Sequence, residues 1–316
     1  MSSIPKPICI EPAFDDPEQV RALFERHAPY RTNAYYLPIR SGSSGLPWFR
    51  GTWASGGEPL VAGAETILHN QLFIEAARTL FGTSRLRPSL VVVNVNAPMP
   101  AGPTHVDIPT FHGATREQYP LGFLRAMGVS ELFERWRVIQ AGAVSWFYDG
   151  PGGNFEYWPE GRDGPMRTER PPFRNVAIMA DNDRMYHRIG RVGAPDAKLP
   201  RMTAAAEIRP VGDGNGAIME NGETRATYPF AAIRLSLVWK ADLETEANFE
   251  SLTLDRVMSV MSIFIADLRQ QGADFHVPAD PFRQCLDGSS GPQLPWMVHP
   301  QRPRNEMRSE LAKPYQ

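Results

Sequence analysis

The sequence predicts a mainly β protein with flanking helices. Three short apolar segments, 90–95, 175–180 and 232–240, are bounded by Pro, Gly or polar turn residues, which is the pattern of buried strands. Segments 138–148 and 153–158 are also strand-like, and a short Gly/Pro turn separates them. This spacing predicts a β-hairpin in the centre of the core.

Helices are expected on both sides of this β region. Residues 17–28 follow an acidic pair that can cap a helix. As a helix, they would place apolar side chains on one face. Residues 64–80 repeat an apolar side chain every four positions. Residues 253–271 carry a broad apolar stripe that needs cover. We expect it to pack on the outside of the β core, with a homodimer interface as the alternative.

These elements predict a single domain over 1–316. Its first part, 1–84, holds the N-terminal helices and an aromatic segment. The core spans 85–242, with a Gly/Pro-rich insertion at about 194–230, and a C-terminal helix and tail fill 243–316.

Composition and charge argue against nucleic-acid binding and membrane association. A hydrophobic content of 42% and a charged content of 22% are ordinary for a globular protein. A net charge of −2 gives no basic surface for nucleic acid. We find no apolar run of membrane-spanning length and no signal-peptide pattern, so we expect a cytoplasmic protein that does not bind membranes. Cys9 and Cys285 are then expected to be free thiols.

Two candidate metal ligands lie in the segment Pro103-Thr-His-Val-Asp-Ile-Pro109. On a strand His105 and Asp107 point to the same face, and together they supply two of the three ligands of a 2-His-1-carboxylate metal site, which leaves open coordination positions. A strand-end His hydrogen-bonded to a neighbouring Asp is the simpler alternative. His187 opens another short strand and is the candidate for the third ligand. His112 is its rival, although strand parity would turn it to the other face.

A second polar pair lies in the strand-like segment 232–240. Arg234 and Ser236 share one face, while apolar residues alternate with them on the other. An Arg inside an apolar strand is costly unless it meets an anion, and its planar guanidinium suits a carboxylate.

In their order and strand context, these residues resemble the iron(II)- and 2-oxoglutarate-dependent oxygenases, over about residues 85–242. That family has a His-x-Asp, a distant second His and a later Arg-x-Ser on a double-stranded β-helix, or jelly roll. The resemblance implies that His105, Asp107 and His187 bind iron. It further implies that Arg234, helped by Ser236, binds the far carboxylate of 2-oxoglutarate.

One spacing departs from the family pattern. Arg234 lies 47 residues beyond His187, farther than is usual, and the insertion at 194–230 accounts for the difference. Arg188 and Arg191 are the rival carboxylate-binding residues.

The resemblance implies an oxygenase that uses Fe(II), 2-oxoglutarate and O2, releases succinate and CO2, and most often hydroxylates a C–H bond. Because Asp107 fills the position that related halogenases leave for chloride, halogenation is not expected; desaturation and cyclisation stay open. We expect a small organic substrate, such as an amino acid derivative or natural-product intermediate. The alternatives are a cupin-like metalloenzyme that does not use 2-oxoglutarate, and a binding module without activity.

The aromatic segment at 30–54 could cover such a substrate, or could be a surface loop held by buried aromatic residues. The candidate substrate contacts are Tyr36, Trp48, Arg50, His112 and Phe147.

Overall fold

The computed structural model describes residues 4–32, 46–119, 121–197, 199–200, 202–244, 251–253, 255–260 and 262; the side chains of residues 122, 123, 126 and 129 are left out. The chain divides into two compact units, formed by residues 1–107 with 139–245 and by residues 108–138 with 246–316. The expectation of a single domain stays a prediction. The expected helix at 253–271 falls largely outside the described residues.

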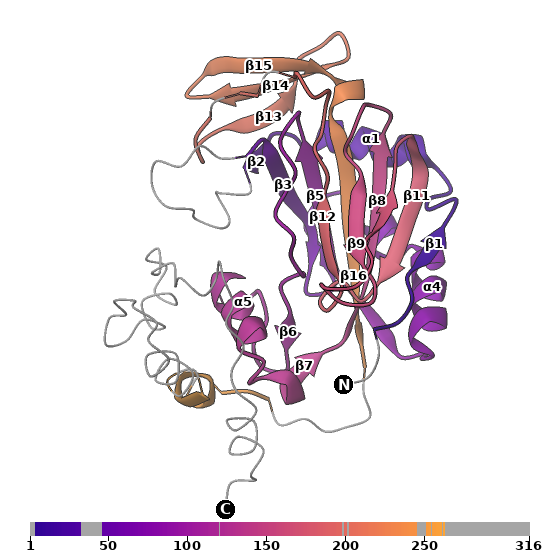
Figure 1. Ribbon diagram of the computed structural model, residues 1–316, viewed down its shortest axis with the longest axis vertical. Helices are drawn as coiled ribbons and strands as arrows, with labels where there is room; N and C mark the ends of the chain where they lie inside the picture. The colour runs from indigo at the N-terminus through magenta and orange to yellow at the C-terminus, as the bar shows by residue number, and fades with distance from the viewer. Residues whose placement is uncertain are drawn as a thin grey trace, which may run out of the picture. The chain divides into compact units, whose positions relative to one another are not determined.

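The first unit contains nearly all of the regular structure (Figure 1). Its helices are α1 (Pro17–Arg26), α3 (Ala64–Leu68), α4 (Gln71–Phe81) and the short η2 (Phe230–Ala232). Its strands are β1 (Ile8–Ile10), β2 (Tyr30–Thr32), β3 (Trp48–Ser55), β4 (Glu58–Pro59), β5 (Leu86–Asn96), β8 (Gln140–Tyr148), β9 (Phe155–Trp158), β10 (Arg167–Glu169), β11 (Phe173–Ala180), β12 (Tyr186–Ile189), β13 (Glu207–Pro210), β14 (Asn215–Glu220), β15 (Glu223–Pro229) and β16 (Arg234–Leu243). The second unit contains β6 (Thr110–Phe111), α5 (Leu121–Ser130), η1 (Glu134–Trp136) and β7 (Arg137–Val138).

Two antiparallel sheets face each other in the first unit. The large one has the order β1-β11-β8-β16-β5-β3-β2-β13-β14-β15, with β4 paired to β3. The small one has the order β10-β9-β12, and a bridge between His105 and His187 adds the segment around residue 105 to its edge.

The chain alternates between these sheets. It runs from β5 in the large sheet to residue 105 in the small one, then through β8 (large), β9 and β10 (small), β11 (large), β12 (small) and β16 (large). This alternation is the connectivity of a double-stranded β-helix. The predicted mainly β, jelly-roll fold class is therefore confirmed.

The predicted hairpin at 138–158 is wrong. The two strands form as expected, but β8 pairs with β11 and β16, whereas β9 pairs with β10 and β12. The Gly/Pro turn between them carries the chain from one sheet to the other. A turn signal shows where a strand ends, but it does not show on which sheet the next strand finds its partners.

In the first unit, α1, α3 and α4 pack their buried side chains into the core on the outer face of the large sheet; α1 and α4 are labelled in Figure 1. Asp16 caps α1 by accepting a hydrogen bond from the Gln19 backbone N–H, as its sequence predicts. The helix expected over 64–80 is broken in two instead. Asn70 caps a new helix, α4, by accepting from the Phe73 backbone N–H, and this local bond competes with continuation of the first helix.

The insertion at 194–230 forms β13, β14 and β15, which extend the large sheet from β2. Within the described ranges, none of the helices combines the length and the apolar character needed to cross a membrane.

The two faces of the large sheet differ in chemistry. On β16 the odd-numbered residues Leu235, Leu237 and Trp239 pack into the main hydrophobic core. The even-numbered residues face the small sheet, and three of them, Arg234, Ser236 and Lys240, are polar and almost fully buried. The polar inner face of β16 is where the candidate site begins.

Candidate metal centre

His105, Asp107 and His187 come together between the two sheets. Each can offer one ligand atom, and these atoms lie within 4.8 Å of one another. The backbone explains the convergence, because His105 and His187 exchange both backbone hydrogen bonds, His105 N to His187 O at 3.0 Å and His187 N to His105 O at 2.8 Å. The Asp107 backbone N–H then donates to Asn182 O, in the turn that leads into β12.

Both imidazoles are oriented by backbone carbonyls. His105 Nδ1 donates to Pro103 O at 2.8 Å, and His187 Nδ1 donates to Met185 O at 2.9 Å. A carbonyl can only accept, so each Nδ1 carries the proton and Nε2 is the nitrogen that can bind a metal. His187 Nε2 lies 3.5 Å from Asp107 Oδ1, and the ring centroids of His105 and His187 are 4.5 Å apart.

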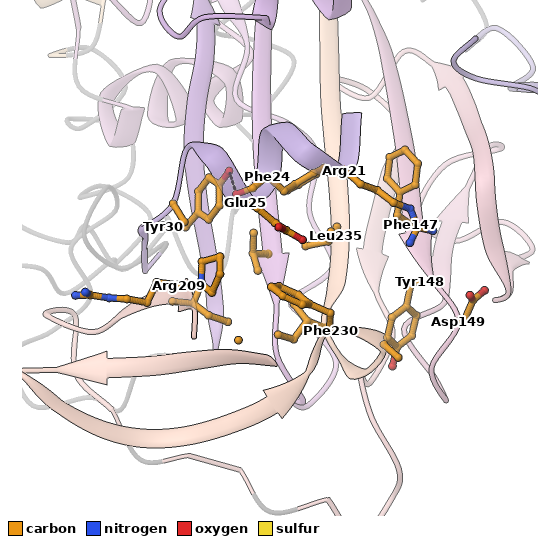
Figure 2. A pocket seen from close by; sticks show the side chains of 17 residues that line it. Arg21, Phe24, Glu25, Tyr30, Phe147, Tyr148, Asp149, Arg209, Phe230 and Leu235 are labelled. Carbon is orange, nitrogen blue, oxygen red and sulfur yellow. Dashed lines mark hydrogen bonds between the residues drawn. The ribbon is translucent and has the colours of Figure 1, made fainter. Parts of the chain in front are cut away.

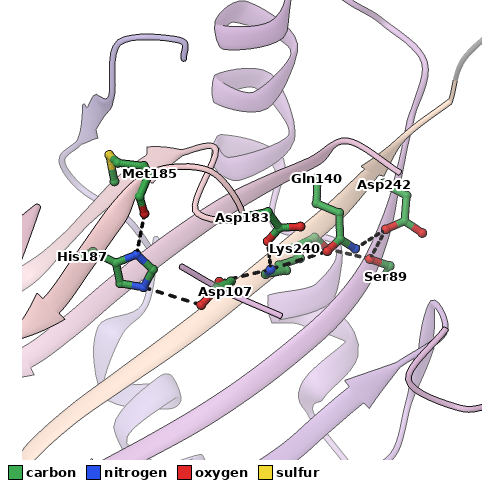
Figure 3. Close-up of polar contacts among 8 residues, drawn as sticks. All are labelled: Ser89, Asp107, Gln140, Asp183, Met185, His187, Lys240 and Asp242. Carbon is green, nitrogen blue, oxygen red and sulfur yellow. Dashed lines mark hydrogen bonds and ion pairs between the residues drawn. The ribbon is translucent and has the colours of Figure 1, made fainter. Parts of the chain in front are cut away.

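Lys240 sets the charge beside the triad. Its Nζ lies 3.1 Å from Asp107 Oδ2 and also donates to Asp183, whose side chain is 2% exposed (Figure 3). Burial raises the pKa of Asp107, but the Lys240 ammonium and the contact with His187 outweigh it and hold that pKa well below its ordinary value. Asp107 is therefore a carboxylate at neutral pH, the form that binds a divalent cation.

Arg234 lies at the other end of the same strand face. It is 1% exposed, its Nε donates to Gly153 O at 2.8 Å, and its Nη1 is 3.4 Å from Ser236 Oγ. Nη2 has no hydrogen-bond partner among the described residues, and neither does Oδ1 of Asn96, directly across the strand pair. Burial lowers the pKa of Arg234, which marks a cation that lacks a compensating anion.

The rival arginines are already engaged. Arg188 forms an ion pair with Glu156, its cross-strand partner on β9. Arg191 donates to the backbone carbonyls of Ala194 and Pro195. Neither presents a buried guanidinium with an unused donor, so Arg234 is the better candidate for binding a carboxylate.

Of the candidate substrate contacts, Trp48 lies beside the triad and Arg50 lies on the same strand face as Trp48. Trp48 is half-buried beside the triad, with its ring centroid 6.2 Å from that of His105, and its Nε1 donates to Asn94 Oδ1. Arg50 lies on the same face of β3, across from Asn94. Their proposed contact with substrate stays a prediction.

His112 belongs to the second unit, where its backbone N–H donates to Trp136 O and its carbonyl accepts from Leu252 N. Its proposed role also stays a prediction, and Tyr36 lies outside the described residues.

The structure places Phe147 away from the triad, and its proposed contact with substrate stays a prediction. Phe147 is opposite Leu235 in the β8–β16 pair, so strand parity turns it to the outer face of the large sheet, away from the triad. There its ring stacks on Phe14, with centroids 5.9 Å apart, in the main core. Alternation along β8 defines two faces, but it does not say which one looks inward.

Phe147 instead lines a cavity of about 220 Å³ on that outer face (Figure 2). Aromatic and aliphatic side chains form most of its wall and come from α1, β2, β5, β8, β13, η2 and β16. Four charged residues, Arg21, Glu25, Asp149 and Arg209, also line it. Within the part of the chain that the structure describes, the one cluster suited to a metal ion is His105, Asp107 and His187. None of these three residues lines the cavity, so the cavity is separate from the candidate metal centre.

Sequence reasoning missed four polar residues that the fold brings to the inner face. They are Asn94, Asn96, Asp183 and Lys240. A signal for three of them was present. Asn94 and Asn96 interrupt a valine run at alternate positions, and Lys240 has the same parity as Arg234 on one strand. Nothing local marks Asp183, because it reaches the site through a turn.

Comparisons with known proteins give similarity at the level of fold. Neither the family models nor the curated proteins searched match this chain. Solved structures similar to it include an oxidoreductase of the 2OG-Fe(II) oxygenase family from Burkholderia pseudomallei, 13% identical over 78% of this chain and 88% of that chain, with a TM-score of 0.41.

Two further solved structures are similar to the chain. A prolyl-4-hydroxylase from Pseudomonas putida is 12% identical over 76% of this chain and 94% of that chain, with a TM-score of 0.41. HygX from Streptomyces hygroscopicus, solved with nickel and 2-oxoglutarate bound, is 10% identical over 79% of this chain and 89% of that chain, with a TM-score of 0.40. Similarity this distant assigns no chemistry, which has to come from the residues of the site.

Proposed function

We propose that this protein is an iron(II)- and 2-oxoglutarate-dependent oxygenase. The observation that carries the proposal is the inner face of one β-helix, which holds a 2-His-1-carboxylate cluster and a buried arginine with an unused donor. Such a triad binds iron(II) on one side and leaves positions for other ligands. A buried guanidinium without a carboxylate partner is suited to an anionic ligand.

The donor atoms fit these groups. Two imidazole Nε2 atoms and one carboxylate oxygen are the ligand set of non-haem iron oxygenases. At the other end, Arg234 Nη2 and Ser236 Oγ can donate to a carboxylate, and both side chains are at most 2% exposed. 2-Oxoglutarate has a metal-chelating keto acid at one end and a carboxylate at the other, so it matches both ends of the site.

The residues have separate tasks. His105, Asp107 and His187 would hold the metal, with Pro103 O and Met185 O keeping the imidazoles in the binding tautomer. Arg234 and Ser236 would bind and orient the far carboxylate of the cosubstrate. Phe155, whose ring centroid is 5.7 Å from that of His187, helps to exclude water from the inner side of the site. Iron(II) and 2-oxoglutarate, once bound, supply the oxidation of a C–H bond by O2, with release of succinate and CO2.

We further propose that the reaction is a hydroxylation of a small organic molecule, such as an amino acid derivative or a natural-product intermediate. Trp48, half-buried beside His105, offers an aromatic wall for such a substrate. Arg50, on the same strand face, could meet an acidic group. The absence of a strong net charge, at −2, agrees with a small substrate rather than nucleic acid.

Anaerobic addition of iron(II) and 2-oxoglutarate tests the proposed function. A visible charge-transfer band is expected only when both ligands share one metal, because the chromophore is the chelate itself. Metal binding without the band would favour a cupin-like metalloenzyme that does not use 2-oxoglutarate. Failure to bind metal would favour a binding module in which Arg234 holds another acid.

A further inference from the structure

The two oxygens of Asp107 have different neighbours. Oδ1 lies 3.5 Å from His187 Nε2, on the side of the imidazoles, whereas Oδ2 lies 3.1 Å from Lys240 Nζ. A metal held by both histidines would therefore meet Oδ1 first. The second oxygen is already held by a cation from the opposite sheet.

Lys240 is built into this position. Its side chain is 3% exposed, and burial of an ammonium is costly unless anionic and polar partners surround it. Those partners are Asp107, Asp183 and, at 3.5 Å, Gln140 Oε1. Gln140 in turn donates to Asp242 Oδ1, so the ammonium belongs to a continuous polar network (Figure 3).

The same ammonium joins both segments that carry the triad. Asp107 follows His105, and Asp183 lies in the turn that leads into β12 and His187. Gly142, across the strand pair from Lys240, lets this turn approach, because a Cβ there would lie 3.0 Å from Asn182 Nδ2. Lys240 thus ties both segments to β16.

We infer that Lys240 is a positioning residue that holds Asp107 Oδ2 and so limits this carboxylate to one-oxygen coordination of the metal. The inference rests on the proposed function. A carboxylate that bound through both oxygens would take a further coordination position, and the keto acid needs two positions to chelate. By holding Oδ2, Lys240 keeps those positions available for 2-oxoglutarate.

Lys240→Met tests the inference, because it removes the ammonium and keeps most of the side-chain volume. We expect manganese(II) affinity, measured by calorimetry, to be equal or higher, since a nearby positive charge is lost. The 2-oxoglutarate affinity of the iron(II) protein, read from the anaerobic charge-transfer band, should fall by about 10- to 100-fold. A general loss of structure would weaken both ligands, so this split is specific to the proposed role.

Two matched variants separate positioning from simple charge. Asp183→Asn keeps an oxygen that can accept from Lys240 and keeps the contact between Lys240 and Asp107, so the 2-oxoglutarate affinity should fall by less than in Lys240→Met. Lys240→Met combined with Asp183→Asn keeps the net charge of the cluster and is the safer variant for folding. Its affinity for 2-oxoglutarate should still be lower than that of the wild type. Recovery of wild-type affinity in this double variant would overturn the inference.

The wild-type protein gives a test that needs no variant. In a crystal structure with manganese(II), Asp107 should bind through Oδ1 alone, with Oδ2 still on Lys240; binding through both oxygens, or a Lys240 turned away, would refute the role. The outcomes are separable from those of the proposed function. A wild-type protein that gives no band contradicts the proposed function, whereas a normal band in all three variants contradicts only the role of Lys240.

Discussion

The two ends of the inner face of β16 hold buried cations in opposite circumstances. Lys240, at one end, meets two carboxylates, Asp107 and Asp183. Arg234, at the other end, meets a backbone carbonyl and a hydroxyl, and its Nη2 has no hydrogen-bond partner among the described residues. A buried charge that the protein itself satisfies maintains structure, whereas one that it leaves unsatisfied is suited to receive a ligand.

The difference between these two cations predicts that replacing Lys240 destabilises the protein far more than replacing Arg234. Lys240→Met leaves the buried Asp183 carboxylate and the half-buried Asp107 carboxylate without their shared cation, and loss of one partner from a buried ion pair costs about 3–5 kcal/mol. Arg234→Met removes a cation that has no carboxylate partner, so the unfolding free energy should change by less than about 1 kcal/mol. Urea unfolding of both variants near pH 7 measures the difference. Equal destabilisation would mean that the two ends are alike and would break the comparison.

The second prediction concerns the metal end. His187→Ala removes a metal ligand. Loss of a residue that only hydrogen-bonds to a ligand lowers metal affinity by about 10- to 100-fold, so loss of the ligand itself should lower it by more than about 100-fold. Calorimetry with manganese(II) measures it. His69→Ala, at the exposed end of α3, is the matched control and should bind like the wild type. Full metal occupancy in the His187 variant would place the third ligand elsewhere.

The third prediction concerns the anion end. Arg234→Met should leave manganese(II) affinity unchanged and weaken 2-oxoglutarate at least about tenfold, because a charge-assisted hydrogen bond contributes about 1.5–3 kcal/mol. Titration of 2-oxoglutarate into the metal-loaded variant gives the value. A variant that binds the cosubstrate as tightly as the wild type would exclude Arg234 as its carboxylate partner.

The smallest effects are expected at the rival arginines. Arg188→Ala breaks an ion pair with Glu156 on partly exposed side chains, and Arg191→Ala removes contacts to backbone carbonyls. Each should change 2-oxoglutarate affinity by less than about twofold, as for other surface positions. A larger loss in either variant would move the anion end of the site toward β12.

Side-chain alternation allowed much of this site to be predicted from the sequence. The i, i+2 spacing of His105 and Asp107, and of Arg234 and Ser236, set each pair on one face of its segment. The structure brings His187 to the first pair, as the sequence predicts, and it confirms the jelly-roll class.

What the sequence could not supply was the pairing of strands. Alternation along β8 did not reveal which face turns inward, and the structure places Phe147 on the outer face, away from the triad. A turn signal suggested that β8 and β9 form a hairpin, although they lie in different sheets. Asp183 contacts Lys240 only because the turn between β11 and β12 folds back over β16. These features depend on contacts between distant segments, which local patterns do not encode.

The central claim is that one ligand spans the triad and Arg234, and calorimetric titration of 2-oxoglutarate tests it most directly. The wild-type protein should bind 2-oxoglutarate tightly when loaded with manganese(II). Binding should weaken strongly either when the metal is removed or when Arg234 is replaced by Met. Equal affinity in the metal-loaded, metal-free and Arg234→Met proteins would contradict the account, because the cosubstrate would then bind at neither end of this site.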